Sequence, residues 1–430
     1  MTDTPSSRAV GRRSFLALAG GALGSGALAA CGDGLGAGDA LSTAGGSLRL
    51  SQWYHQFGDE GTQKAIEGYA QAYPGARVTV QWNPGDYDQK VAGALGAGGG
   101  PDIFESGNGP TIDMIQGGQV VDMSGILGDA QSDYTKSLVQ RMTYKGKLYA
   151  IPQATDLQLL VYRKSLLQTA GLQPPTTVDE LIAAAKKLTT EKVKGFFAGN
   201  DGGVGALGGP MLWAAGQDYL NDDQTQMGFD ANRGAEAFGR LRTLFTSNAL
   251  LLGAPADWSD PTAFTTGLTA MQWTGLWSLP TIEQALPGDY GVMAWPALDA
   301  QGKPSVPVSA YGACVSARSH NVDAAKGFVK WLWVDQTARQ LDFAQARGFR
   351  IPARQSVAAK AEKLTKPPAS DAVTLLTQHG HMQSPILWTP TCAAAFTTAL
   401  TRIVKEGADA KGEIETMTST VDAELQRVNG

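Results

Sequence analysis

The sequence predicts an α/β protein with two domains, and two observations carry this prediction. From residue 48 onward, segments that alternate apolar and polar side chains take turns with segments whose apolar residues recur at helical spacing. This succession is typical of a sheet whose strands are covered by helices. The chain also has 430 residues, and a single hydrophobic core stops growing at roughly 250 to 300 residues.

The folded part opens with a strand, a helix and a second strand. Residues 48–53 and 77–82 alternate apolar and polar side chains, and residues 61–73 between them have helical spacing up to a Pro-Gly pair. A second helix is expected at 86–95, where a glycine run ends it, and the string PDIFE at 101–105 then predicts a short buried strand.

Later segments repeat the theme. Strands are expected at 146–153 and 157–164, followed by a helix at 178–189. Thr177 stands at its N-cap position with Glu180 three residues on, which is the pattern of a capping box. The remaining expected elements are strands at 194–199, 268–275 and 290–296, and helices at 323–334, 394–407 and 413–428.

Residues 1–30 have the parts of an export signal: a basic start, an apolar run and small residues before a cleavage point. The run is too short and too rich in glycine to cross a bilayer. Within it, GRRSFL with Arg12 and Arg13 resembles the twin-arginine motif, with ordinary unfolded secretion as the alternative. LAAC, ending at Cys31, resembles the bacterial lipoprotein box. That resemblance implies that Cys31 carries a lipid and begins the mature chain.

Residues 31–46 are predicted to be a lipidated flexible tether. They consist mainly of Gly, Ala and small polar residues, which cannot bury enough apolar surface to fold. A tether of this length has a reach of about 20 Å. It would hold the folded part near a membrane while leaving it free to reorient.

Charge and cysteine content exclude several classes of function. The 40 acidic residues outnumber the 35 basic ones, so nucleic acid is not an expected partner, since it requires a basic face. Cys314 and Cys392 could pair in an oxidising compartment, but two separate buried thiols are favoured. The HGH string at 379–381 lacks a third metal ligand at a recognisable spacing, so a solvated loop is favoured there. No cofactor or metal is expected.

Four strings, in this order, resemble the extracellular solute-binding proteins of ATP-driven sugar importers, the family that includes maltose-binding protein. They are FGDEGTQKAIEGYAQAYPGARVTVQW leading through DYDQKVAGALGAGGGPDIFE, then GKLYAIPQATDLQLLVYRKSLLQTAGLQPPTTVDELIAAAKKLT, then AMQWTGLWSLP with YGVMAWP, and SHNVDAAKGFVKWLWVDQ with GFRIPAR. The matches run from about residue 48 to 356.

The resemblance implies a type II periplasmic-binding-protein-like fold, in which two α/β lobes hold the ligand in the cleft between them. The chain would cross between lobes near residues 153–158, 291–293 and 334–336. One lobe would then comprise 47–155 and 293–334, and the other 156–292 and 335–430. The resemblance also implies a monomer on the outer face of the plasma membrane, with the permease of an ABC importer as its partner.

A sugar offers hydroxyls that need directional hydrogen bonds and C–H faces that pack on aromatic rings, so its site mixes aromatic and polar side chains. The chain places such mixtures in loops after its predicted strands, where ligands of open α/β sheets bind. The expected ligand contacts, several of them carried over from the family, are Trp53, Tyr54, Gln56, Asn108, Asp156, Trp277, Tyr311, Arg350 and Trp388. Packing is the alternative for Trp53 and Tyr311. Turn geometry is the alternative for Asn108, and a hinge-capping role is the alternative for Asp156.

The sequence therefore predicts a carbohydrate receptor and not an enzyme. A secreted carbohydrate-active enzyme remains the alternative from another class, because a catalytic pair could exist among so many carboxylates. The same fold could also bind a peptide, a polyamine or a metal chelate. The mixture of side chains in the candidate cleft favours a neutral, polyhydroxylated ligand.

Overall fold

The structure is a computed structural model that describes residues 48–56, 60–345 and 350–430. The chain separates into two units, 1–46 and 47–430, and the described residues belong to the second. The predicted export signal, the tether and the lipid attachment at Cys31 lie outside the described residues. No helix in the described ranges has the length and apolar character needed to span a bilayer.

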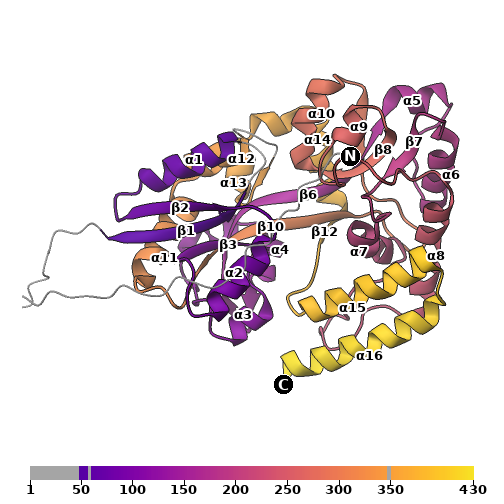
Figure 1. The fold of residues 1–430 in the computed structure, drawn as a ribbon. Helices are drawn as coiled ribbons and strands as arrows, with labels where there is room; N and C mark the ends of the chain where they lie inside the picture. Colours follow the sequence, from indigo (N-terminus) through magenta and orange to yellow (C-terminus); the bar gives the residue numbers. More distant parts are fainter. Residues whose placement is uncertain (1–47, 57–59, 346–349) are drawn as a thin grey trace, which may run out of the picture. The chain divides into compact units, whose positions relative to one another are not determined.

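The described unit is built around one sheet, whose strands are ordered β2-β1-β3-β10-β6-β8-β7 (Figure 1). Three short strands lie off this path, two pairing with β6 and one with β10. The strands are β1 (Arg49–His55), β2 (Arg77–Asn83), β3 (Ile103–Gly107), β6 (Ile151–Arg163), β7 (Lys194–Phe197), β8 (Thr269–Gly275), β9 (Tyr290–Met293), β10 (Val306–Val315), β11 (Ile351–Pro352) and β12 (Gly380–Met382). A separate hairpin joins β4 (Thr143–Tyr144) to β5 (Lys147–Leu148).

The central strand β6 is shared by two groups of strands. Its first half pairs with β10 on one edge and β11 on the other. Its second half pairs with β8 on one edge and β9 on the other. The sequence predicted two strands here, but partners on both edges pair the backbone through the polar stretch between them, so the strand continues unbroken.

Helices cover the sheet and divide into two sets (Figure 1). With β1, β2 and β3 lie α1 (Glu60–Gln71), α2 (Tyr87–Gly96), α3 (Ile112–Gln116), α4 (Lys136–Arg141), α11 (Val322–Lys330), α12 (Thr337–Gln345) and α13 (Gln355–Ala358). With β7 and β8 lie α5 (Lys164–Thr169), α6 (Val178–Leu188), α7 (Val204–Ala214), α8 (Ala231–Thr246), α9 (Thr262–Thr265), α10 (Leu279–Ala285), α15 (Pro390–Thr401) and α16 (Ala410–Asn429). Helix α14 (Ala369–His379) contacts β6, β9 and β10.

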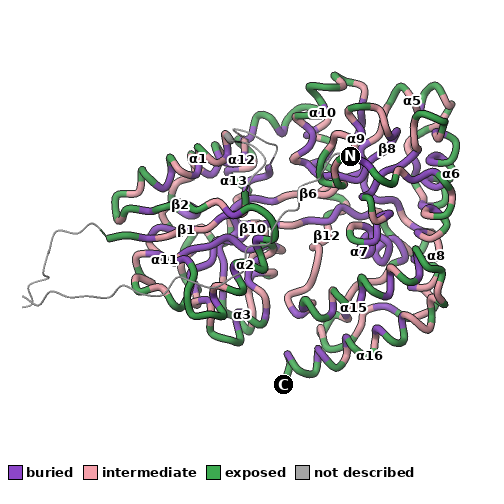
Figure 2. The backbone as a smooth tube through the Cα atoms, viewed as in Figure 1, coloured by how far each residue is buried: buried purple, intermediate pink, exposed green. Residues whose placement is uncertain are grey.

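Two large hydrophobic cores follow this division (Figure 2). Leu50, Phe104 and Phe328 belong to the first, and Phe196 and Phe238 belong to the second. The first core also takes up buried residues of α9, α10 and β9 near β6. Two cores on one shared strand confirm the predicted α/β fold with two lobes, each a sheet covered by helices.

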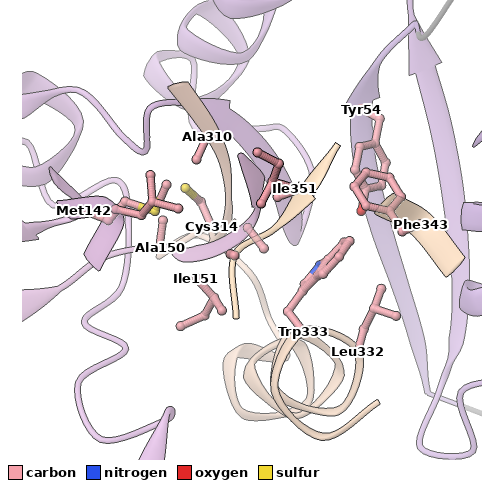
Figure 3. Close-up of a cluster of buried hydrophobic side chains, with 14 of the residues drawn as sticks. Tyr54, Met142, Ala150, Ile151, Ala310, Cys314, Leu332, Trp333, Phe343 and Ile351 are labelled. Atoms are coloured by element: carbon pink, nitrogen blue, oxygen red, sulfur yellow. The ribbon is translucent and has the colours of Figure 1, made fainter. Parts of the chain in front are cut away.

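The position of α12 differs from the expected division of the chain. The sequence analysis assigned 335–430 to the second lobe, but α12 packs against α1, and the Tyr69 hydroxyl donates to the carboxylate of Asp342. Phe343 lies beside Tyr54 and Trp333 in the first core (Figure 3). The segment directly after 334 therefore stays in the first lobe before the chain reaches α15 and α16.

The start of α6 confirms the capping box. The Glu180 amide donates to Thr177 Oγ1 at 3.2 Å, and the Thr177 amide donates to Glu180 Oε2 at 3.3 Å. This exchange satisfies two helix-terminal N–H groups. Cys314 and Cys392 are both buried free thiols, so the favoured alternative holds and they do not form a disulfide.

Close packing of β7 on α6 leads to a prediction at Gly195. A Cβ atom there would lie 1.8 Å from the carbonyl oxygen of Ala185, a backbone atom that cannot move aside on its own. We expect Gly195→Ala to lower the free energy of unfolding by more than about 2 kcal/mol, as strain in a packed region does. The measurement is urea unfolding followed by circular dichroism.

Gly239, inside α8, is the matched control because a Cβ there meets no atom within 4 Å. Gly239→Ala should leave the stability unchanged or raise it by up to about 1 kcal/mol, since alanine is the better helix former. Equal effects of the two substitutions would contradict the described packing of β7 on α6.

Candidate functional site

One face of β6 carries polar side chains at the point where the strand passes between the two groups of strands. Residues 155–159 alternate, so that Asp156 and Gln158 are half-buried while their neighbours are buried. Ser309 of β10 lies directly opposite Asp156. Tyr311 follows two residues later on the same side of β10, and it is also half-buried. Because side chains two residues apart share a face of a strand, these four form one polar surface.

Charged groups from β1 and β3 adjoin this surface. The His55 amide donates to Glu105 Oε1 at 2.8 Å, and the His55 ring is bonded to the same carboxylate oxygen. The His55 ring also stacks on Tyr311, with 4.7 Å between ring centroids and 18° between planes. These contacts place the end of β1 beside the polar face of β6 and β10.

Electrostatic interactions tie Asp156 and Arg350 to the same group. Burial raises the pKa of Asp156, and the positive charge of Arg350, followed by His55, opposes the rise. Burial also raises the pKa of Glu105, against the effects of His55 and Arg350. Arg350 is buried, with its guanidinium 5.2 Å from the centroid of the Phe343 ring. The structure thus brings together three predicted site residues, Asp156, Tyr311 and Arg350.

Two carboxylate oxygens of this group are buried without a hydrogen-bond partner among the described residues. They are Asp156 Oδ1 and Glu105 Oε2. Buried polar atoms in folded proteins nearly always have a partner, whether protein, water or ligand. Both oxygens can accept hydrogen bonds, so the group is suited to a ligand rich in hydroxyl donors.

Trp277 supplies an aromatic surface next to the same face. Its ring lies over the backbone of Gly275, where a Cβ atom would come within 2.0 Å of the indole. Gly275 pairs with Gln158 on β6. The indole nitrogen of Trp277 donates to the Ser259 carbonyl at 2.8 Å, and the ring is half-buried, 6.0 Å from that of Trp258. The ring is thereby held in place next to the strand that carries Asp156.

A second aromatic group involves Trp388, which is half-buried against the second core. Its ring lies 4.7 Å from that of Tyr219. Nearby in the chain, His381 of β12 stacks on Trp213, with 4.2 Å between centroids, and its Nε2 lies 3.0 Å from Asp218 Oδ2. Trp213 is buried in the second lobe.

Asn108 connects β10 to the segment that follows β12. Its side-chain amide donates to Gln383 Oε1 at 3.3 Å, while its backbone amide donates to the Ala310 carbonyl at 2.8 Å. It also has a φ of 58°, which asparagine tolerates better than most residues. Both interpretations of Asn108, as a turn residue and as a polar group at the candidate site, therefore agree with its position.

The three predicted contacts around His55 at the end of β1 differ in their positions. Tyr54 is fully buried and lies in the first core beside Trp333 and Phe343 (Figure 3). Trp53 packs partly against that core, and its carbonyl accepts a bond from Tyr87 at 3.0 Å. Gln56 is exposed where the strand ends. Tyr54 has no surface for a ligand in this structure, because alternation along β1 turns it inward.

The HGH string is not the solvated loop that the sequence favoured. His379 ends α14 and residues 380–382 form β12, which pairs with β10. No group of three or more potential metal-ligating side chains occurs within the described ranges. His381 instead forms the ion pair with Asp218. Sequence reasoning missed Asp218, which lies far from β12 in the chain, and Gln158, which the period-two pattern from Asp156 could have indicated.

Contacts between α3 and α16 join the lobes a second time. Arg427 Nη2 donates to Asp113 Oδ1 at 2.8 Å, and Gln116 Nε2 donates to the Val428 carbonyl at 2.6 Å. Arg427 is also paired with Glu424, whose carboxylate accepts a bond from Thr389, the N-cap residue of α15. This network connects the first lobe to the residue that directly follows Trp388.

A two-lobed α/β fold with a polar and aromatic surface at the shared strand is the architecture of a solute-binding protein. Residues 57–336 match the family model of the bacterial extracellular solute-binding proteins. The chain belongs to this family, and the resemblance recognised in the sequence is confirmed.

Two curated relatives have names that describe sugar binding. The maltotriose-binding protein of Pyrococcus abyssi is 28% identical over 280 residues, which cover 63% of this chain and 58% of that protein. The diacetylchitobiose-binding protein DasA of Streptomyces coelicolor is 26% identical over 294 residues, covering 64% of this chain and 65% of that one. The matched segments thus span less than two thirds of either relative.

Solved structures confirm the type II fold. A solute-binding protein of an ABC transporter from Thermotoga lettingae, solved with α-D-tagatose, is 25% identical, with a TM-score of 0.76 over 88% of this chain and 100% of that one. The GacH receptor of Streptomyces glaucescens, solved unliganded and with acarbose, is 22% identical with a TM-score of 0.73, covering 88% and 99% of the two chains.

The ion pair of Asp218 with His381 leads to a prediction about pH. Burial lowers the pKa of His381, but the bonds to Asp218 and to the Met382 carbonyl outweigh it, so the pKa lies above its ordinary value. We therefore expect Asp218→Asn to lower the pKa of His381, as measured by NMR titration of its ring protons. Asp222→Asn, at an exposed position, is the control and should leave that pKa unchanged.

The same pair sets the sign of a stability effect. A raised histidine pKa contributes stability below pH about 6.5 that is lost as the pH rises through the raised pKa. The free energy of unfolding should therefore fall more on Asp218→Asn at pH 6 than at pH 8.5. A larger loss at pH 8.5 would show that the pair does not stabilise the folded protein.

Proposed function

We propose that this chain is a lipid-anchored extracytoplasmic receptor that captures a carbohydrate by closure of its two lobes and delivers it to an ABC importer. One observation carries the proposal. Where β6 passes between the lobes, buried carboxylate oxygens of Asp156 and Glu105 lie with Arg350, Tyr311 and the half-buried ring of Trp277. Acceptors for hydroxyl groups beside an aromatic face suit the two kinds of surface that a sugar presents.

The relatives support the class of ligand. The curated relatives are named for maltotriose and diacetylchitobiose, and the Thermotoga lettingae protein was solved with α-D-tagatose. Membership in a family of extracellular solute-binding proteins supports an extracytoplasmic location. The proposed anchor is Cys31, the proposed partner is a permease in the same membrane, and the proposed receptor is a monomer without enzymatic activity.

Closure would couple binding to recognition by the permease. Ligand bound to one lobe would be covered by the other, and only a difference in affinity between the open and closed forms can shift their equilibrium. Moving it from about 1:99 to 99:1 needs about 5.5 kcal/mol. A micromolar ligand, at about 8 kcal/mol in total, could supply this.

The proposal is tested by titrating the intrinsic tryptophan fluorescence of the protein with mono-, di- and oligosaccharides, amino acids and peptides. Saturable changes with sugars alone are the expected result. Saturation with peptides or amino acids alone would show that this protein binds a ligand of another class. Release of product from an oligosaccharide during the titration would contradict a pure binding function and favour the enzyme.

Trp277→Ala should weaken binding of the sugar at least about tenfold while leaving the fold intact, because the ring contributes a C–H stacking surface. The measurement is the dissociation constant from the same titration, with circular dichroism as the check on folding. Trp331→Ala is the matched control, since Trp331 packs on Tyr73 and Phe328. An unchanged affinity of the Trp277 variant would show that Trp277 does not contact the bound sugar.

A further inference from the structure

Arg141 lines a cavity between the lobes that the sequence did not predict. The cavity has a volume of about 280 Å³. Its first wall comes from α4 and β4 of the first lobe, and the opposite wall comes from Asp218, Gln224 and the segment 381–386. This is the segment that contacts Asn108 through Gln383 and leads to Trp388. The segment also connects the cavity to the candidate sugar site, because Met382 pairs with Val308 of β10, the neighbour of Ser309.

The guanidinium of Arg141 is only partly satisfied. Its Nε donates to the Ser384 carbonyl at 2.7 Å, which anchors the side chain across the cavity. Its Nη1 is buried, and no described residue accepts a hydrogen bond from it. Burial lowers the pKa of Arg141 to about 10, so the group remains charged at neutral pH. A buried charge without a hydrogen-bonded partner is costly, and an anionic ligand group would remove this cost.

The other ionisable groups of the cavity wall are bonded to each other. Among the described lining residues they are Asp218 and His381, whose ion pair is 3.0 Å long. Asp218 also accepts bonds from the Trp213 indole at 3.1 Å and the Tyr219 amide at 2.7 Å. This carboxylate thus already accepts from three donors, and no described ion pair joins it to Arg141, whose Nη1 still lacks an acceptor.

We infer that the cavity beside Arg141 receives a single carboxylate of the bound carbohydrate, so that the ligand is an acidic sugar such as one containing a uronic acid unit. The inference rests on the proposed function and names its substrate class. A planar carboxylate matches the paired N–H groups of a guanidinium. A dianionic phosphate fits less well, because the guanidinium of Arg141 balances only one of its two charges.

The test compares matched ligands by isothermal titration calorimetry at pH 7. Glucose, galactose and neutral disaccharides are each paired with the counterpart that carries a carboxylate at C6 of one unit. We expect at least one acidic member to bind about tenfold or more tightly than its neutral partner, with an advantage that shrinks as salt is added.

Substitutions at Arg141 test whether this residue causes the preference for the acidic sugar. Arg141→Gln should abolish the preference while changing the affinity for the neutral partner less than about twofold, and Arg141→Lys should retain part of it because the charge remains. Arg402→Gln, at an exposed arginine paired with Glu413, is the control and should keep the full preference. Thermal unfolding of each variant checks that the Ser384 contact is not needed for folding.

Two negative results separate the two proposals. If neutral sugars bind and no acidic counterpart binds more tightly, the inference about Arg141 is overturned while the carbohydrate receptor stands. If no sugar of either kind binds, the proposed function itself fails. A preference for acidic sugars that persists in Arg141→Gln would also overturn the assignment of the carboxylate to this cavity.

Discussion

The structure depends on the continuity of β6 through both lobes. Its first half is paired by β10 and β11, and its second half by β8 and β9, so backbone hydrogen bonds hold both ends of one strand. Any change in the angle between the lobes must pass through the middle of this strand and the neighbouring crossings. Asp156 and Gln158 are located at that point, where the proposed lobe movement and ligand contact would be coupled.

Burying the carboxylates near β6 costs free energy. Asp156 and Glu105 are held where burial raises their pKa values, and Arg350 with His55 offsets part of that penalty. Such groups weaken a folded protein unless partners satisfy them. Their persistence next to an aromatic ring, together with Arg141 in the connected cavity, is the pattern of a site whose ligand completes the hydrogen bonding.

Local sequence patterns were sufficient to predict most of the helices and strands. Thr177 and Glu180 predicted the start of α6 because a capping box depends on residues three apart. The alternation along β1 was also local, and it could have shown that Tyr54 faces the core, since Trp53 and His55 occupy the other face. The family resemblance, by contrast, implies a ligand contact at Tyr54, which the inward-facing side chain does not provide.

Features that depend on distant packing were beyond the sequence. The position of α12 in the first lobe is fixed by contacts such as the one between Tyr69 and Asp342, two residues 273 positions apart in the chain. Arg141 of α4 and Asp218 after α7 line one cavity only because both contact the segment 381–386 there. No spacing in the sequence indicates these long-range contacts. The sequence could therefore predict Asp156, Tyr311 and Arg350 as members of the candidate site, but it could not predict the cavity beside Arg141.

Small-angle X-ray scattering tests the central claim most directly, because it reports whether a ligand changes the arrangement of the lobes about β6. The account predicts that a carbohydrate which saturates the fluorescence change also lowers the radius of gyration of the protein, whereas a sugar that does not bind leaves it unchanged. A bound carbohydrate that leaves the radius of gyration the same would contradict capture by lobe closure.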